Sequence, residues 1–509
     1  MNILKKLSDQ KLIGIQCCLL VALQPILDIY RTFIGNKFQL FGISLLEILN
    51  FVFIGYLFLL TIYNKEFRKN IKYIIIYCAF LIVYLIFHLY NITQFDLSIL
   101  NGSTHSLITE LYFIIRSYLF PLLVLYIFLN SHIERKMVLR TISYISFFIC
   151  IIIIFTNITK SSFITYASDL PEFSTISNNI FDWFTQTKFE SVSLLTSKGW
   201  FYSGNQISII LFMLLPVVLY SLMSPWRSKI DALCVMIHPI AMIMVGTKTA
   251  GFGSIIIISL SIILYLLFSV IMKQIKFNKH VFVIMLLSFL CATFLIIKSP
   301  VMQGVLDQKS LSFEENEKIE EELSNIPRNY KDINIHQLST LINENHNYFG
   351  IHKDYLKLYP VEKNPEFWFH VMLDNTQSQM NFRNFKVRIY KEVLKDSGNS
   401  LDRWTGIGYV SNFPYVESDI RGQNVWFGYL GTLMFIGPFI IAFLWSVIKI
   451  IKNIKQHFNL QVCMIGMAVS AGIVLSYLAG HLFGYLFPVI TFCFIEGFLI
   501  QSIRENKLD

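Results

Sequence analysis

Apolar residues fill nearly the whole chain in long stretches that short polar segments separate. A bilayer core takes about 20 apolar residues per helical span. We therefore predict transmembrane helices near residues 12–30, 40–62, 72–90, 111–129, 138–156, 202–222, 230–247, 251–271, 280–297, 425–448, 460–478 and 481–500. The expected fold is an all-α polytopic membrane protein with about 12 transmembrane helices and one long, largely helical extracytoplasmic loop.

The composition agrees with this interpretation. Hydrophobic residues make up 54% of the 509 residues and charged residues only 15%, and the mean hydropathy is +0.56. Water-soluble domains carry about 25% charged residues. The deficit of charge excludes a cytosolic enzyme and most nucleic-acid-binding proteins, so we expect no nucleic-acid partner.

Lys and Arg are divided unevenly between alternate loops. One set of loops, together with both termini, carries Lys5, Lys6, Lys11, Lys65, Arg68, Lys69, Lys72, Arg135, Lys136, Arg140, Arg227, Lys229, Lys273, Lys276, Lys279, Lys449, Lys452, Lys455, Arg504 and Lys507. Because cytoplasmic loops are enriched in these residues, we expect both termini in the cytoplasm. Much of the net charge of +9 therefore sets topology and does not indicate an acidic partner.

This topology divides the chain into three parts. We expect transmembrane helices over 1–297, an extracytoplasmic loop domain over 298–424, and further transmembrane helices with a cytoplasmic tail over 425–509. All eight cysteines fall within the predicted spans. This placement excludes disulfides in the outer loops and argues against a cysteine metal site.

The long outer connection contains three segments of distinct character. Residues 314–322 form a charge run, typical of a solvated helix or surface. Residues 366–373 are aromatic and apolar, which suits either a segment in the membrane interface or a core helix of the outer domain. Residues 381–395 have the spacing of an amphipathic helix, with Arg383 and Arg388 among its basic residues. These basic residues would attract either lipid headgroups or a diphosphate, which a guanidinium can bind through two hydrogen bonds.

Ionisable groups inside spans are costly and usually functional. Asp28, Glu47 and Arg116 lie at similar predicted depths, about 10 Å below the outer surface at 1.5 Å per residue. Either Glu47 and Arg116 form a structural ion pair, or the three groups line the floor of an outward-facing cavity. Lys248 lies at the tip of a short outer loop, and residues 199–205, with Trp200 and Asn205, enter the sixth span from the same side.

The end of the outer loop carries a motif with family character. Glu417 stands eleven residues before Gly428 and fourteen before Gly431. This pattern resembles the O-antigen ligase and polymerase superfamily of bacterial envelope enzymes, in which a His at that spacing precedes G-x-x-G at a helix entrance. Lys248, the 199–205 segment, the basic helix followed by Gly406-Ile407-Gly408, and the twelve-span plan with its long outer loop also match.

Two departures qualify the resemblance. Glu417 stands in place of the His, and Lys248 in place of an Arg that ligases often have. The resemblance therefore implies a surface polysaccharide polymerase, or a ligase-like enzyme of another wall glycan, more than a lipopolysaccharide ligase. It also implies a donor glycan on a polyprenyl diphosphate, typically undecaprenyl diphosphate, and a glycan acceptor at the outer leaflet of the bacterial cell membrane. The resemblance further implies a reaction without a nucleotide sugar, metal or other cofactor, and a place beside flippase and chain-length or export proteins.

The site assignment follows from this chemistry. A carboxylate can accept the proton of an attacking sugar hydroxyl, so Glu417, with Asp419 beside it, is the candidate catalytic group. Cations can stabilise the departing diphosphate, and Lys248, Arg383 and Arg388 are the candidates. Attack opposite the leaving group would invert the anomeric centre.

Arg116, Asn205 and Trp200 complete the predicted substrate-binding set. Two other interpretations of the acidic pair stay open. Glu417 and Asp419 could only cap the helix that follows them, or they could ligate a divalent cation.

Two other interpretations compete with an O-antigen ligase-like enzyme. A lipid-linked oligosaccharide flippase or secondary transporter shares the twelve-span plan, but the chain shows no internal repeat and its long loop is placed off-centre. A multispan glycosyltransferase with an acidic metal motif in its first outer loop is the second rival. That loop, residues 31–39, contains no acidic residue.

Overall fold

The computed structural model describes residues 10–35, 39–40, 43–64, 70–165, 173–185, 192–303, 327, 329–346, 349, 351, 353–373, 383–411, 413, 416, 418–478 and 480–505. Its long helices are α2 (Gln10–Ile34), α3 (Leu45–Tyr63), α5 (Ile71–Gln94), α6 (Leu107–Ile114) continued by η3 (Ile115–Leu119) and α7 (Phe120–Asn130), α8 (Arg135–Ile158), α10 (Gly204–Met223), α11 (Lys229–Val245), α12 (Lys248–Leu266) continued by η5 (Leu267–Ile271), α13 (Lys279–Lys298), α20 (Asp419–Lys452), α22 (Leu460–Leu478) and α23 (Leu486–Arg504). The only sheet in the described residues is the two-residue pair β1 (Gln39–Leu40) and β2 (Ile43–Ser44), which is antiparallel.

The expected polytopic all-α fold is confirmed. Eleven helices in the described residues are long and apolar enough to cross a membrane. The remaining predicted span, 230–247, is α11, which has 17 residues and is about 26 Å long at 1.5 Å per residue. This length lies at the lower end of the range for a transmembrane helix.

The second span starts later than predicted. Helix α3 begins at Leu45, and Ser44 caps it by accepting a hydrogen bond from the Glu47 N–H at 3.3 Å. Glu47 therefore lies in the first helical turn, where its side chain also accepts from the Ser44 hydroxyl at 3.2 Å. It is not seven residues inside the span, as its predicted depth required.

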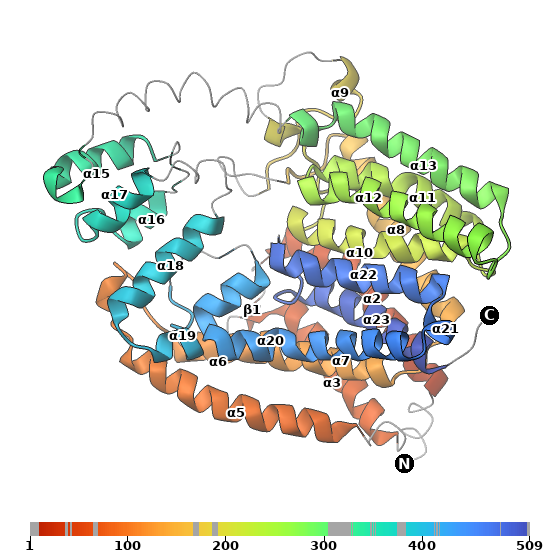
Figure 1. Ribbon diagram of the computed structural model, residues 1–509, viewed down its shortest axis with the longest axis horizontal. Helices are drawn as coiled ribbons and strands as arrows, with labels where there is room; N and C mark the ends of the chain where they lie inside the picture. Colours follow the sequence, from red (N-terminus) through yellow and green to blue (C-terminus); the bar gives the residue numbers. More distant parts are fainter. Residues whose placement is uncertain are drawn as a thin grey trace. The chain divides into compact units, whose positions relative to one another are not determined.

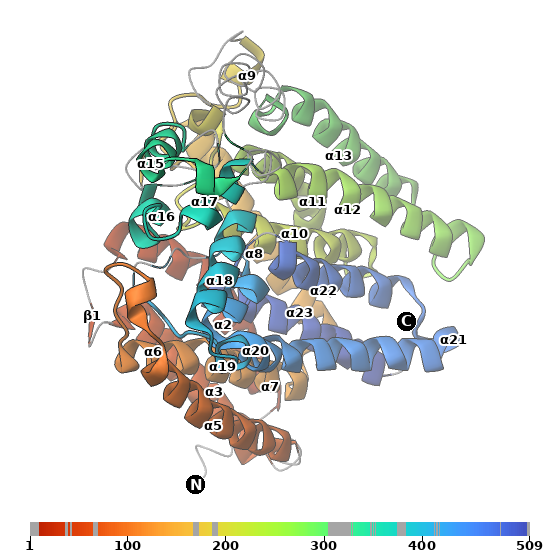
Figure 2. The same ribbon diagram turned by 60° about the vertical axis from the view of Figure 1, so that its left-hand side comes forward.

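The chain divides into two compact units. The first comprises Met1–Ile74, Leu119–Val305 and Pro438–Asp509, and the second comprises Ile75–Tyr118 and Leu306–Gly437. In the first unit α10 packs against α22 and α23, and the three helices run side by side in both ribbon views (Figure 1, Figure 2). Every residue in the apolar window of α23 is buried, against 28% for α3, so α23 is central and α3 peripheral in this unit.

The second unit contains α5, α6 and the described part of the long connection. The helices of that connection are η6 (Tyr330–Asp332), α15 (Ile335–Glu344), α16 (Lys353–Leu358), α17 (Pro365–Leu373), α18 (Arg383–Ser397) and α19 (Leu401–Thr405). In α17 the side chains of Phe367, Trp368 and Phe369 are buried, and the Trp368 indole donates to the Tyr359 carbonyl at 2.9 Å. Of the two interpretations of residues 366–373, the core helix is therefore correct.

The predicted amphipathic helix is α18. Its apolar positions Phe385, Ile389 and Val393 are at most 2% exposed. Phe385 packs edge-on against the Tyr355 ring of α16, with ring centroids 5.3 Å apart. The periodic apolar face thus forms part of the core of the second unit, while the charge run at 314–322 lies outside the described residues.

Candidate functional site

The loop that enters α10 holds the first group of polar residues. This loop lies at the same end of the first unit as the end of α13, where the long connection begins. We call this end the outer end, because the sequence predicts that it faces the outside. Gly199 takes a positive φ of 69°, and its N–H donates to the Ser162 hydroxyl at 2.8 Å. The Ser197 hydroxyl donates to the same oxygen at 2.7 Å, and the Trp200 indole donates to the Ser161 carbonyl at 3.1 Å. These bonds tie the loop down just before Tyr202.

Tyr202 is held at three points by charged side chains. Its N–H donates to Asp28 Oδ2 at 2.9 Å, and its carbonyl accepts from the Lys198 ammonium at 2.9 Å. The Arg31 guanidinium lies 4.0 Å from the centre of the Tyr202 ring and 5.5 Å from that of Tyr485. Asp28 lies six residues before the end of α2, about 9 Å along the helix.

This cluster has more positive than negative charge. Asp28 and Lys198 are 8% and 5% exposed, and Arg31 is half-buried. The guanidinium of Arg31 has no hydrogen bond or ion pair to any residue that the structure describes. Its N–H donors are arranged to bind carboxylate or phosphate through two bonds. The cluster can therefore hold an anion at the outer end of α2.

The short loop with Lys248 packs on the same segment. Gly246 ends α11 in the left-handed conformation, Thr247 caps α12, and Lys248 is the first residue of α12 and is exposed. The Ser197 N–H donates to the Met244 carbonyl at 2.8 Å. The Ser208 hydroxyl of α10 also lies 2.8 Å from the Thr247 hydroxyl. The loop before α10 and the loop that carries Lys248 therefore pack together.

In the second unit the Gly406-Ile407-Gly408 turn packs on the start of α20. Gly406 and Gly408 both have positive φ values, 81° and 76°. The Gly408 N–H donates to the Trp426 carbonyl at 2.8 Å. A Cβ on Gly406 would lie 2.1 Å from the same oxygen. The turn therefore needs glycine for close backbone packing, and nothing in its geometry requires a phosphate.

The G-x-x-G motif has a packing role as well. Gly428 interrupts α20 with φ 65° and ψ −170°, and a Cβ there would lie 2.4 Å from the Trp404 carbonyl carbon. A Cβ on Gly431 would lie 2.5 Å from the Tyr84 hydroxyl, which donates to the Phe427 carbonyl at 2.7 Å. At this motif α20 is kinked and packs against the end of α19 and against α5.

A buried polar pair, His88 and Glu110, holds the turn that packs on this kink. His88 Nε2 lies 2.8 Å from Glu110 Oε1, and His88 Nδ1 lies 2.6 Å from the Thr405 carbonyl. The other Glu110 oxygen accepts from the Tyr409 N–H at 2.7 Å. His88 and Glu110 are 0% and 2% exposed. Since every one of these contacts is internal, the pair holds the turn and offers little to a ligand.

Two further contacts fix the same turn. The Asn91 amide donates to Asp402 Oδ1 at 2.7 Å and to the Gly406 carbonyl at 3.0 Å. His105, in the connection between α5 and α6, lies with Nε2 2.9 Å from the Ile407 carbonyl. Burial lowers the pKa of His105 below its ordinary value, which the bond to the carbonyl offsets only in part.

The predicted catalytic residues are only partly described. Glu417 lies outside the described residues, and Asp419 is the first residue of α20, with 3% of its side chain exposed. Arg116 lies in η3, nine residues after the start of α6, and so further along its helix than predicted. Because Glu47 belongs to the first unit and Arg116 to the second, the Glu47–Arg116 ion pair stays a prediction.

The predicted binding residues are distributed over both units. Lys248, Trp200 and Asn205 belong to the first unit; Asn205 is the second residue of α10 and is half-buried. Arg383 is the first residue of α18 in the second unit, and Arg388 lies on the same helix.

The Arg388 guanidinium lies 5.9 Å from the centre of the Phe367 ring. This contact presses the basic part of α18 against the core of the loop helices. The attraction of this helix for lipid headgroups or for a diphosphate stays a prediction.

Sequence reasoning missed Arg31, Lys198 and Tyr202. Arg31 and Lys198 lie in short loops, where a basic residue is unremarkable in the sequence, although both lie close enough to Asp28 to compensate its charge. The signal was Asp28 itself, because a carboxylate inside a span needs a nearby cation or donor. Within the described ranges, no group of three or more His, Cys, Asp or Glu side chains is placed to hold a metal. Metal-independent chemistry stays a prediction.

Comparison with known protein families identifies a match over nearly the whole chain. The family model described as O-antigen ligase like membrane protein matches residues 16–506, nearly the whole chain. No curated protein matches the chain. The family indicates a multi-pass membrane enzyme of the glycosyl-transfer type in surface polysaccharide biosynthesis. The chain therefore belongs to the family of O-antigen ligase-like membrane proteins.

Proposed function

We propose that the protein transfers a glycan from a polyprenyl-diphosphate carrier to an acceptor glycan at the outer leaflet, as a surface polysaccharide polymerase or ligase-like enzyme. The observation that carries the proposal is the cationic cluster around Tyr202, in which the Arg31 guanidinium forms no hydrogen bond to any described residue. A diphosphate matches this chemistry because it offers several charged oxygens to a planar donor group.

The cluster would act on the leaving group. As the bond between the anomeric carbon and the diphosphate oxygen breaks, negative charge gathers on the diphosphate. Fixed cations stabilise such developing charge without reorganising. In our proposal Arg31 and Lys198 supply this charge, and Asp28 and Tyr202 hold the two cations in place. Lys248 is exposed at the start of the adjacent helix and is the next candidate to contact the donor.

The attacking hydroxyl needs a base on the other side of the anomeric carbon. Glu417 keeps this role in the proposal, with Asp419 beside it, and attack opposite the leaving group inverts the centre. Arg116, Arg383, Arg388, Asn205 and Trp200 stay the proposed substrate-binding set. No metal or cofactor takes part.

The proposed setting is the bacterial cytoplasmic membrane. Both termini lie in the cytoplasm, and the long connection lies outside, as the distribution of Lys and Arg predicts. The donor then reaches the enzyme after a flippase has moved it across the bilayer. Chain-length or export proteins would receive the product.

Reconstitution into liposomes tests the proposal. Wild-type protein receives a lipid-linked repeat unit and an acceptor glycan, and both the glycan product and the released polyprenyl diphosphate are measured. We expect Glu417→Gln and Lys248→Ala to reduce transfer at least tenfold, in keeping with typical general-base and charge-stabilisation effects. Unchanged release in both variants would refute the site assignment. Movement of the intact donor without bond formation would instead identify a flippase.

A further inference from the structure

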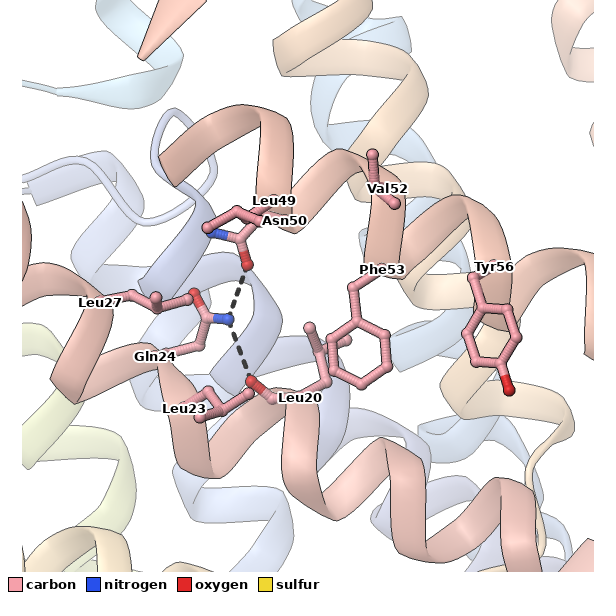
Figure 3. Close-up of a pocket in the computed structure, with 9 residues that line it drawn as sticks. All are labelled: Leu20, Leu23, Gln24, Leu27, Leu49, Asn50, Val52, Phe53 and Tyr56. Atoms are coloured by element: carbon pink, nitrogen blue, oxygen red, sulfur yellow. Dashed lines mark hydrogen bonds between the residues drawn. The ribbon is translucent and has the colours of Figure 1, made fainter. Parts of the chain in front are cut away.

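A groove runs between α2 and α3 in the first unit (Figure 3). It has a volume of about 400 Å³ and is lined by Leu20, Leu23, Gln24 and Leu27 of α2 and by Leu49, Asn50, Val52, Phe53 and Tyr56 of α3. Leu49 and Val52 are 51% and 66% exposed. Since both helices are membrane spans, the groove opens on a surface that lipid chains contact.

The two amides in the groove are bonded to the protein. Gln24 Nε2 donates to Asn50 Oδ1 at 2.8 Å and to the Leu20 carbonyl at 3.0 Å (Figure 3). Asn50 Nδ2 donates to the Leu46 carbonyl at 3.2 Å. The Gln24–Asn50 bond joins the two helices at this level, and the rest of the wall is almost entirely apolar. The groove therefore suits a hydrocarbon chain.

The same seam continues to the charged cluster. Beyond Leu27 a second, smaller hollow is lined by Tyr30, Arg31, Ile34 and Gly35 of the α2 end and by Ser44, Leu45 and Leu46 of the α3 start. Arg31 lies four residues beyond Leu27, about 6 Å along the helix. A chain in the groove would thus place a headgroup bonded to its outer end beside the Arg31 guanidinium.

We propose that the α2–α3 groove binds the isoprenoid chain of the lipid-linked donor and that Arg31 binds its diphosphate. The inference rests on the proposed function, because that function supplies a donor with a diphosphate at the end of an apolar chain. Hydrocarbon inside a bilayer gains little from contact with an apolar wall. The selectivity must therefore come from the anionic end, with the groove fixing the direction from which the chain approaches.

Binding by purified full-length protein in detergent micelles tests this site. The probes are undecaprenyl diphosphate and inorganic diphosphate, which lacks the chain. Leu27→Trp and Val52→Trp fill the groove; Val52 is 66% exposed, so its replacement needs no buried space. Ile26→Trp is the matched control, because Ile26 lies on α2 like Leu27, is 52% exposed and does not line the groove.

We expect the two groove variants to raise the Kd for undecaprenyl diphosphate about fivefold to tenfold and to leave the Kd for inorganic diphosphate unchanged. Arg31→Gln should raise both about tenfold or more, since it removes a bidentate charged contact. Ile26→Trp should match wild type. Groove variants that match the control would overturn the inference. So would equal displacement of undecaprenyl diphosphate by dioleoylphosphatidylglycerol, which would show that ordinary phospholipid fills the groove.

The result is separable from that of the transfer assay. Binding that follows this pattern while reconstituted protein makes no glycan product would refute the proposed function and keep the site. Glycan transfer that is equally fast in Leu27→Trp, Val52→Trp and wild type, with unchanged binding, would keep the function and refute the site.

Discussion

Replacement of Gly428 by alanine is a direct test of whether the G-x-x-G motif is structural. Gly428 interrupts α20 with φ 65° and ψ −170°, a region of backbone conformation that only glycine occupies readily. The Cβ of an alanine there would lie 2.4 Å from the carbonyl carbon of Trp404 and 2.5 Å from its oxygen. Neither atom belongs to a flexible side chain, so the backbone itself would have to move.

The cost can be estimated from these two terms. A residue forced into such a conformation costs about 1–3 kcal/mol. Overpacking of a well-packed site costs about 1–3 kcal/mol more. With an unfolding entropy of about 2.1 cal/mol/K per residue, the sum of about 2–6 kcal/mol corresponds to a fall in Tm of about 2–6 °C for a chain of 509 residues.

Thermal unfolding of the purified protein in detergent measures the effect. Gly466→Ala is the control, because Gly466 lies inside the long helix α22 and no heavy atom would come within 4 Å of its Cβ. Alanine is favoured over glycine in a helix by about 1 kcal/mol, so this variant should melt at or above the wild-type temperature. A Gly428→Ala protein with an unchanged Tm would refute the packing role of the motif.

Three further outcomes follow from the described contacts. Asp28→Ala should lower the Tm more than Asp28→Asn, because the amide oxygen can still accept from the Tyr202 N–H, and a lost buried acceptor costs about 1–3 kcal/mol. Arg31→Lys should keep the positive charge but weaken undecaprenyl diphosphate binding about fivefold, since an ammonium cannot form the bidentate contact. Burial lowers the pKa of His105 from 6.5, so the stability that this histidine contributes is complete above about pH 6.5 and is lost as the pH falls below it. A plot of Tm against pH between pH 7 and pH 5 should therefore be flatter for His105→Gln than for wild type.

The transmembrane plan could be predicted because it depends on composition alone. A span needs only enough consecutive apolar residues, and eleven helices in the described residues meet this condition. Boundaries depend on local capping instead. Ser44 starts α3 by accepting the Glu47 N–H, which moved Glu47 from the predicted interior of the span to its first turn. A window average cannot detect such a cap.

The site was harder to predict because its charges serve one another across distant helices. Asp28 was noticed as a costly carboxylate, but its contact is a backbone N–H 174 residues away. No spacing rule links α2 to the loop before α10. By contrast, the apolar face of α18 was predicted correctly from its period, since Phe385, Ile389 and Val393 repeat within one helix.

The glycine motifs and the charged cluster divide the family resemblance into two kinds of residue. Gly406, Gly428 and Gly431 each lie where a Cβ would meet backbone or a neighbouring side chain at 2.5 Å or less. Such positions preserve a fold whatever the substrate is. Arg31 is different, because its N–H donors form no hydrogen bond to any residue that the structure describes. A search for the sugar-transfer chemistry should therefore start from the cations at the outer end of α2, and use the glycines only to recognise the scaffold.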